Sequence, residues 1–189
     1  MAIGGAVENG VCDTVLDWAA FLFEYSAFVP PIRSGPTLAL PGTNVAYRRS
    51  CMPKSTAQCC CAGSGKRRCI PCYRKKASFY ILNDEIRVLH KKKFSFRLFA
   101  QQRFLYSRYY AGLRFGQAHA AARWATCEMS LVLPALSLAR ALRNVMGKKH
   151  FLRQFAWALP YMTIFALIGT CGKFVGCVCG PGNALARIE

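Results

Sequence analysis

The first part of the chain alternates short apolar and polar stretches, as an ordered piece of an α/β protein does. Residues 2–7 are apolar, and the polar residues 8–10 that follow predict a turn. Asp13 or Thr14 can cap a helix that continues to about Phe28, because apolar residues recur near one face of this segment. We therefore expect one amphipathic helix close to the start of the chain.

The next stretch predicts shorter elements. Two prolines at positions 30 and 31 end the helix, and residues 32–36 read as a loop. Residues 38–40 are a brief strand candidate. After a Pro-Gly turn, a second helix is expected to begin near Asn44. Residues 1–50 together form the first of four predicted segments.

Residues 51–78 form the second segment and differ sharply from the rest. They contain no Leu, Val, Phe, Trp, Asp or Glu, and they show neither helical nor strand periodicity. A stretch so poor in aliphatic residues can bury little surface, so its composition predicts loop or disorder.

Regular patterning returns in residues 79–124, the third segment. Two strand-like runs, 79–82 and 86–89, flank a polar tripeptide. From residue 94 to 123 aromatic residues alternate with arginines and no proline occurs, which favours a basic amphipathic helix.

The fourth segment, residues 125–189, is apolar. Residues 129–139 are uncharged but split by Pro134, and residues 155–172 form an 18-residue run without a charge. That run has about the lower length of a transmembrane helix. If the run spans a membrane, the basic residues that precede it predict a cytoplasmic flank: Lys148, Lys149, His150 and Arg153. A buried or re-entrant helix is the alternative, which Pro160 and Gly169 favour.

The net charge of the chain indicates which kinds of molecule it could bind. The chain carries 26 Lys and Arg against 8 Asp and Glu, a net charge of +18. Such an excess suits an anionic partner, whether nucleic acid, a phosphate-bearing substrate or an anionic membrane. Basic residues interleaved with aromatics suit single-stranded nucleic acid, but the apolar tail speaks against that class. An anionic lipid surface is the preferred partner.

Cysteines offer one further candidate site. Six of the 11 cysteines lie between Cys51 and Cys72, and no export signal precedes them, so we expect reduced thiols. Cys69 and Cys72 have the spacing of a zinc knuckle. A small basic membrane protein with a zinc-binding insert is therefore an alternative, although one such pair is a weak signal.

Three stretches, taken in order, resemble the C-terminal portion of bacterial family 2 glycosyltransferases. They are residues 4–49, with GGAVENG and LPGTNVAYRR, residues 83–114, with HKKKFSFRLFAQQRF, and residues 158–182 in the apolar tail. The resemblance implies an α/β fold: the incomplete second half of a GT-A domain, followed by amphipathic and hydrophobic, membrane-associated helices.

The resemblance also implies an activity for an intact relative. Such an enzyme moves a sugar from a nucleotide-sugar donor to a hydroxyl acceptor at the cytoplasmic face of a membrane. Its first half holds a divalent metal, Mg²⁺ or Mn²⁺, through an Asp-x-Asp motif. This chain has no Asp-x-Asp, so we expect a truncated protein that binds no such cofactor.

Candidate site residues follow from the same resemblance. Gly42, Asn44 and Arg48 match the family's Gly-x-Asn-x-x-x-Arg pattern, in which the Asn orients the sugar or acceptor. A helix cap is the alternative role for Asn44. His90 follows a strand where relatives place a histidine near the diphosphate, although it also fits a plain basic face. The candidates for a membrane interface are Lys91, Lys92, Lys93, Arg103 and Arg108.

The chain departs from the family pattern mainly at the catalytic base. This base is a Glu after a Gly-aromatic stretch, and it would fall in residues 51–78, which have no carboxylate. Its loss removes a factor on the order of a hundred to ten thousand in rate. Codons for residues 62–67 can be read two bases later as Gly-Phe-Trp-Glu-Thr, so a pair of frameshifts would explain the segment. We expect an inactive remnant, a pseudoenzyme, with no catalytic residue.

Overall fold

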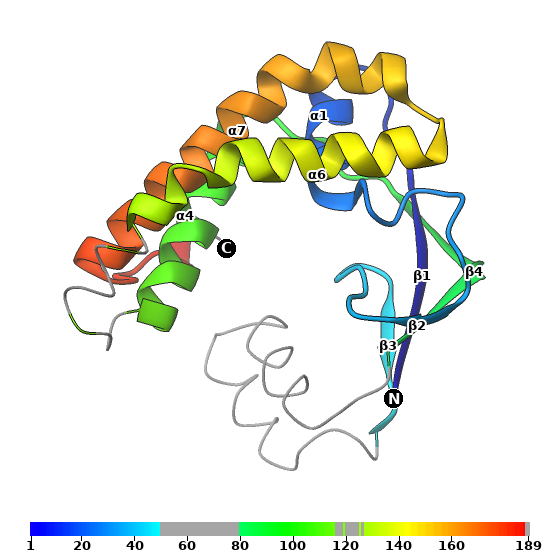
Figure 1. Ribbon diagram of the computed structural model, residues 1–189, viewed down its shortest axis with the longest axis horizontal. Helices are drawn as coiled ribbons and strands as arrows, with labels where there is room; N and C mark the ends of the chain where they lie inside the picture. The colour runs from blue at the N-terminus through cyan, green and yellow to red at the C-terminus, as the bar shows by residue number, and fades with distance from the viewer. Residues whose placement is uncertain (50–79, 116–118, 120–124, 126, 188–189) are drawn as a thin grey trace. The chain divides into compact units, whose positions relative to one another are not determined.

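The computed structural model describes residues 1–49, 80–115, 119, 125 and 127–187. These residues belong to two compact units, each built from two stretches of chain (Figure 1). The sheet unit comprises Met1–Gly10 and Ala27–Lys91, and the helical unit comprises Val11–Ser26 and Lys92–Glu189. The predicted α/β class is confirmed at this level, as a mixed sheet accompanied by helices.

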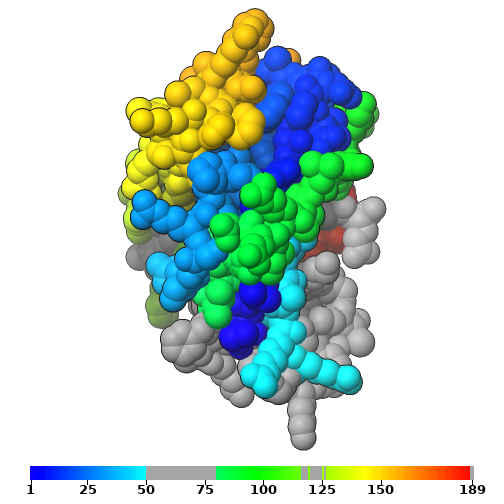
Figure 2. Space-filling model, turned by 90° about the vertical axis from the view of Figure 1, so that its right-hand side faces the viewer, coloured from blue at the N-terminus to red at the C-terminus, as the bar shows by residue number. Residues whose placement is uncertain are grey.

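A four-stranded mixed sheet forms the first unit, in the order β2-β4-β1-β3. The strands are β1 (Ala2–Asn9), β2 (Gly35–Thr37), β3 (Val45–Tyr47) and β4 (Tyr80–His90). The two central strands, β1 and β4, run parallel, and the edge strands pair antiparallel to them. β1 reads as a nearly continuous buried run, which is typical of a central strand. Part of the segment that contains β4 lies at the surface (green in Figure 2).

A bulge interrupts β4. Gly5 of β1 pairs with Asn83, whereas the next residue, Ala6, pairs with Arg87, so three residues of β4 have no partner in the ladder. The two strand-like runs expected in this region are therefore one strand with an irregular middle. Position 5 requires glycine, because a Cβ atom there would lie 1.8 Å from the carbonyl oxygen of Ile86.

Three local expectations for the sheet unit are wrong. The turn at residues 8–10 begins later, because Glu8 and Asn9 still pair with β4. The strand expected at residues 38–40 lies three residues earlier, as β2. No helix begins near Asn44, since Val45–Tyr47 instead pairs with β1, where β-branched and aromatic side chains fit the pleat.

The first helix of the helical unit is confirmed. α1 spans Val15–Tyr25, and Thr14 caps it through a capping box with Asp17. The Thr14 hydroxyl accepts from the Asp17 amide at 3.2 Å, and the Asp17 carboxylate accepts from the Thr14 amide at 3.1 Å. The helix ends at Tyr25, slightly before the expected position.

Among the residues that the structure describes, this unit also contains three longer helices and a short 3-10 turn (Figure 1). They are α4 (Phe96–Phe115), α6 (Leu133–Lys148), α7 (Leu152–Cys179) and η2 (Leu185–Arg187). The uncharged run 129–139 is divided by a turn at residues 131–132, and Pro134 follows in the first turn of α6, where proline is tolerated. α7 packs against α1, α4 and α6 and so forms the centre of the unit.

α4 and α7 run side by side in the same direction. The ring of Phe96 lies 5.4 Å from that of Phe165, near the start of the contact. Farther along, Cβ atoms placed on Gly172 and Gly176 would each lie 2.3 Å from a carbonyl oxygen of α4, of Phe104 and Arg108 respectively. The glycines let the two backbones touch along this part of the pair.

Candidate membrane-binding surface

One side of α7 exposes a stripe of apolar residues. They recur every three or four positions, as residues on one helical face do. The outer stripe, as we call it, consists of Trp157, Pro160, Ile164, Leu167, Cys171, Phe174 and Val178. Trp157 is 63% exposed and Leu167 52%. The opposite side of α7 is also largely apolar but buried, so most of the helix is hydrophobic while only part of it is covered.

Exposed apolar residues continue beyond α7. Leu136 and Met146 of α6 are each 57% exposed, and Met129, before the helix, is 73% exposed. Exposed apolar surface on this scale marks a contact site for a partner or a membrane. By length and composition, α7 is also the single helix among the described residues that could cross a membrane.

The two threonine hydroxyls of α7 are hydrogen-bonded within the helix. The hydroxyl of Thr163 donates to the carbonyl oxygen of Leu159 at 2.9 Å, and that of Thr170 to Ala166 at 3.0 Å. Each hydroxyl is thereby satisfied inside the helix. Such internal bonding suits a helix that contacts hydrocarbon.

A basic corner joins α6 to α7 (yellow in Figure 2). Lys149 and Phe151 adopt the left-handed conformation, with φ of 52° and 63°, which turns the chain sharply between the helices. The Arg153 guanidinium lies 6.0 Å from the centre of the Trp157 ring, the first member of the outer stripe. Positive charge therefore borders the apolar surface.

Lys148, in the same corner, is partly buried. Its ammonium group donates to the carbonyl oxygen of Ser26 at 3.2 Å, at the C-terminal end of α1. Burial lowers the pKa of Lys148 to about 8. This lysine thus supports the packing of α1 against α6.

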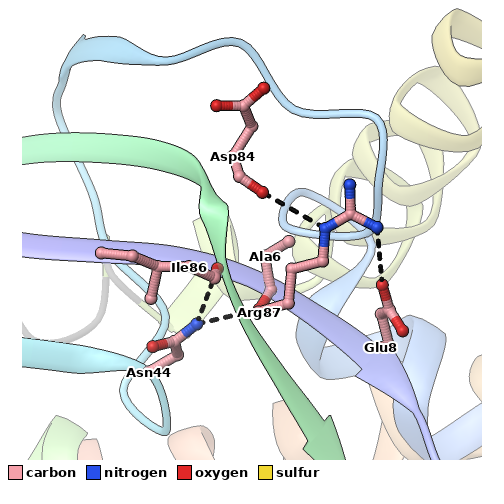
Figure 3. A network of polar contacts seen from close by, with 6 residues as sticks. All are labelled: Ala6, Glu8, Asn44, Asp84, Ile86 and Arg87. Carbon is pink, nitrogen blue, oxygen red and sulfur yellow. Dashed lines mark hydrogen bonds and ion pairs between the residues drawn. The ribbon is translucent and has the colours of Figure 1, made fainter.

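Asn44, the predicted acceptor residue, is buried within the sheet unit. Its side-chain amide donates to the carbonyl oxygens of Ala6, at 2.9 Å, and of Ile86, at 3.3 Å (Figure 3). These two carbonyls lie at the bulge, where ladder hydrogen bonds are interrupted. Both amide hydrogens therefore brace the bulge, and the alternative role of helix cap is wrong because no helix starts here.

The other two acceptor-side candidates lie far from each other. The backbone amide of Arg48 donates to Met1 at 3.1 Å, beside the start of β1. His90 pairs with Asn9 at the end of β1, and its carbonyl accepts from Gly10 at 3.0 Å. At about 3.3 Å per strand residue, the two positions are separated by about 26 Å. The structure does not bring Arg48, Asn44 and His90 into one site.

The predicted membrane-interface residues have varied surroundings. Lys91 is exposed, the Lys92 ammonium lies 4.8 Å from the centre of the Phe94 ring, and Lys93 pairs with Asp13 at 2.6 Å. These three side chains are at the surface of the chain. Their contact with lipid stays a prediction.

Two of the arginines of α4, Arg103 and Arg108, hold helices together. Arg103 forms an ion pair with Glu24 of α1 and lies over the rings of Phe23 and Phe99, 5.3 and 5.2 Å from their centres. The guanidinium of Arg108 donates to the carbonyl oxygen of Gly180 at 3.4 Å, at the C-terminal end of α7. Sequence reasoning missed Glu24 as a partner, because nothing in its spacing points to a residue so far along the chain. Lipid contact by either arginine also stays a prediction.

A polar network borders the bulge. Arg87 donates to Glu8 at 3.3 Å and to the carbonyl oxygen of Asp84 (Figure 3). The Ser34 hydroxyl donates to the Asp84 carboxylate at 2.5 Å, and this bond lowers the pKa of Asp84. No group of three or more potential metal ligands occurs in the part of the chain that the structure describes.

The zinc candidates Cys69 and Cys72 lie outside the described residues, as does the whole of segment 51–78. Comparison of the chain with protein-family models, with curated proteins and with solved structures finds no match.

Proposed function

We propose that this chain is a catalytically inactive remnant of a family 2 glycosyltransferase whose helical unit rests on the cytoplasmic face of a membrane. The order of elements carries the proposal. A mixed sheet is followed by a basic helix and then by a long helix with an exposed apolar stripe. The resemblance implies this same order for the second half of such an enzyme and its hydrophobic tail.

The surroundings of Asn44, Arg48 and His90 support the proposal that this chain does not transfer sugar. Asn44 uses both amide hydrogens on backbone carbonyls, and Arg48 and His90 lie at opposite ends of β1. The chain has no Asp or Glu from residue 25 to 83, where the base of an intact relative would fall. Without a base, the acceptor hydroxyl is not deprotonated as it attacks the donor.

Sugar transfer is tested directly. The purified chain, with Mg²⁺ or Mn²⁺, is incubated with a panel of nucleotide-sugars, and released nucleoside diphosphate is measured. The expected result is release no faster than in buffer. Release above that rate with any donor would contradict the proposed inactivity.

The proposed origin of the chain from a frameshifted glycosyltransferase gene is tested separately, in the nucleotide sequence. Under this proposal, the codons for residues 62–67 read two bases later give Gly-Phe-Trp-Glu-Thr, the aromatic-then-Glu motif that relatives carry. Codons that cannot give this peptide in a shifted frame would reject the frameshift. They would leave the membrane association untouched.

A further inference from the structure

We infer that α7 lies in the plane of an anionic membrane surface, with its outer stripe in the lipid, and does not cross the bilayer. The inference rests on the membrane association proposed above and adds its geometry and its lipid partner. It is argued from α4, the basic helix that packs along α7.

α4 accompanies slightly more than the C-terminal half of α7. The pair begins where Phe96 meets Phe165 and continues through the contacts of Gly172 with Phe104 and of Gly176 with Arg108. At these glycines the two backbones are in contact, with no room for lipid between them. If α7 crossed a bilayer, α4 would have to cross with it.

The composition of α4 makes such a crossing unfavourable. Arginine is among the most costly residues at the centre of a membrane span. α4 carries four arginines and two glutamines: Arg97, Gln101, Gln102, Arg103, Arg108 and Arg114. Arg103 is moreover paired with Glu24, which would bring α1 along. Placed in the membrane plane, α7 inserts only its uncharged outer stripe.

The length of α7 agrees with this placement. Its 28 residues make a helix of about 42 Å, longer than the roughly 30 Å hydrocarbon core. The outer stripe extends over most of that length, from Trp157 to Val178, along a single side. A helix lying in the interface exposes one apolar side to lipid, and other parts of α7 are packed against α1, α4 and α6. A span instead needs lipid-compatible surface around most of its circumference.

The positive charge beside the outer stripe indicates an anionic lipid as the partner. Lys149, His150 and Arg153 border the N-terminal end of the stripe, next to Trp157, a residue type that favours the headgroup region. The whole chain carries a net charge of +18. Phosphatidylglycerol or another anionic lipid complements both features.

Flotation with vesicles tests the binding. The full chain is mixed with vesicles of phosphatidylcholine containing about a third phosphatidylglycerol, an anionic surface of the kind that attracts basic segments, or with phosphatidylcholine alone. We expect binding to the anionic vesicles and at least about tenfold weaker partitioning on the neutral ones. Equal binding to both would overturn the choice of an anionic partner.

A matched pair of substitutions locates the contact. Leu167→Lys, in the middle of the stripe, should weaken partitioning about tenfold or more. Leu38→Lys, at an 84% exposed leucine of the sheet unit, should leave it unchanged. Circular dichroism checks that both variants are folded, and equal effects of the two would contradict the assigned surface.

The depth of two positions of α7 in the bilayer distinguishes a helix that lies in the membrane plane from one that crosses the membrane. Single-tryptophan chains are made by replacing Trp18, Trp124 and Trp157 with Phe and adding either Leu167→Trp or Val178→Trp, and quenching by brominated lipids reports each depth. In-plane binding gives two depths that agree within a few ångströms. A crossing helix separates these positions by about 16 Å along the membrane normal, and that result would overturn the inference while membrane association stands. Failure to bind any vesicle would instead refute the proposed association itself.

Discussion

Gly172 of α7 lies against the carbonyl oxygen of Phe104 on α4, so closely that a Cβ atom at position 172 would stand 2.3 Å from that oxygen. Neither atom can yield easily, since the Cβ position is fixed by the backbone of α7 and the oxygen belongs to the backbone of α4. The contact therefore fixes how closely α4 and α7 approach, and it makes the glycine necessary for a reason of space rather than of backbone conformation.

Gly172→Ala should consequently destabilise the helical unit. We expect a loss of about 2 kcal/mol in the free energy of unfolding, typical of overpacking. Urea unfolding followed by far-ultraviolet circular dichroism measures it. Gly147→Ala in α6 is the matched control, because nothing lies within 4 Å of a Cβ atom there. It should stabilise the helix by about 0.5–1 kcal/mol, and equal effects at the two positions would refute the close contact.

Asn44→Ala tests whether this residue braces the sheet. The change leaves two carbonyl oxygens at the bulge without their donor and should reduce stability by about 2 kcal/mol. Asn83→Ala is the control, since the Asn83 side chain accepts an exposed bond from the Glu85 amide. It should change stability by about 0.5 kcal/mol or less. Asn44→Ala with unaltered stability would argue against the bracing role.

The ion pair between Glu24 and Arg103 should contribute measurably to stability. Both side chains are about four-fifths buried, and the guanidinium also lies over two aromatic rings. A double-mutant cycle with Glu24→Gln and Arg103→Met should give a coupling free energy of about 1–3 kcal/mol. The exposed pair of Glu8 and Arg87 serves as comparison and should give less than about 0.5 kcal/mol. Similar coupling for the two pairs would contradict the difference in burial.

Lys148 should make stability depend on alkaline pH. Its pKa falls from 10.5 in the unfolded chain to about 8 in the folded one, so between these values the unfolded state binds more protons. Stability should then rise as pH increases from about 8 to 10.5 and stay level with respect to this group below 8. Partial exposure will screen the effect.

Lys148→Met isolates that contribution from other groups that titrate in the same range. The difference in unfolding free energy between the variant and the unchanged chain, measured at several pH values, should vary from pH 8 to 10.5 and be constant below. A difference that does not depend on pH would mean that the lysine is solvated in the folded protein.

Local signals predicted the helical unit better than the sheet. α1 was predictable because its cap lies within a few residues of the helix, in the Thr14 and Asp17 side chains. Asn44 was not, because its partners are 38 and 42 residues away and the bulge that needs them forms only when β1 and β4 pair. β3 likewise owes its extended form to β1 rather than to its own three residues.

The candidate surface was predictable in part. The uncharged run of residues 155–172 indicated an apolar helix, and α7 includes it. The run alone does not say which side of the helix is covered, because buried and exposed positions are equally apolar. Arg103 and Arg108 fitted a basic face in the sequence, yet their guanidinium groups contact Glu24 and Gly180, partners that only the packing of three helices reveals.

The first helix of the helical unit, α1, lies far earlier in the sequence than the other helices of that unit. α1 ends at Tyr25, and α7, against which it packs, begins at Leu152. At a synthesis rate of about 5–20 residues per second, a ribosome needs on the order of ten seconds to make the intervening chain. During that interval the apolar side of α1 lacks its native cover. Nascent chains that stop before α7 should accordingly be the ones that depend on chaperones, whatever the stability of the finished protein.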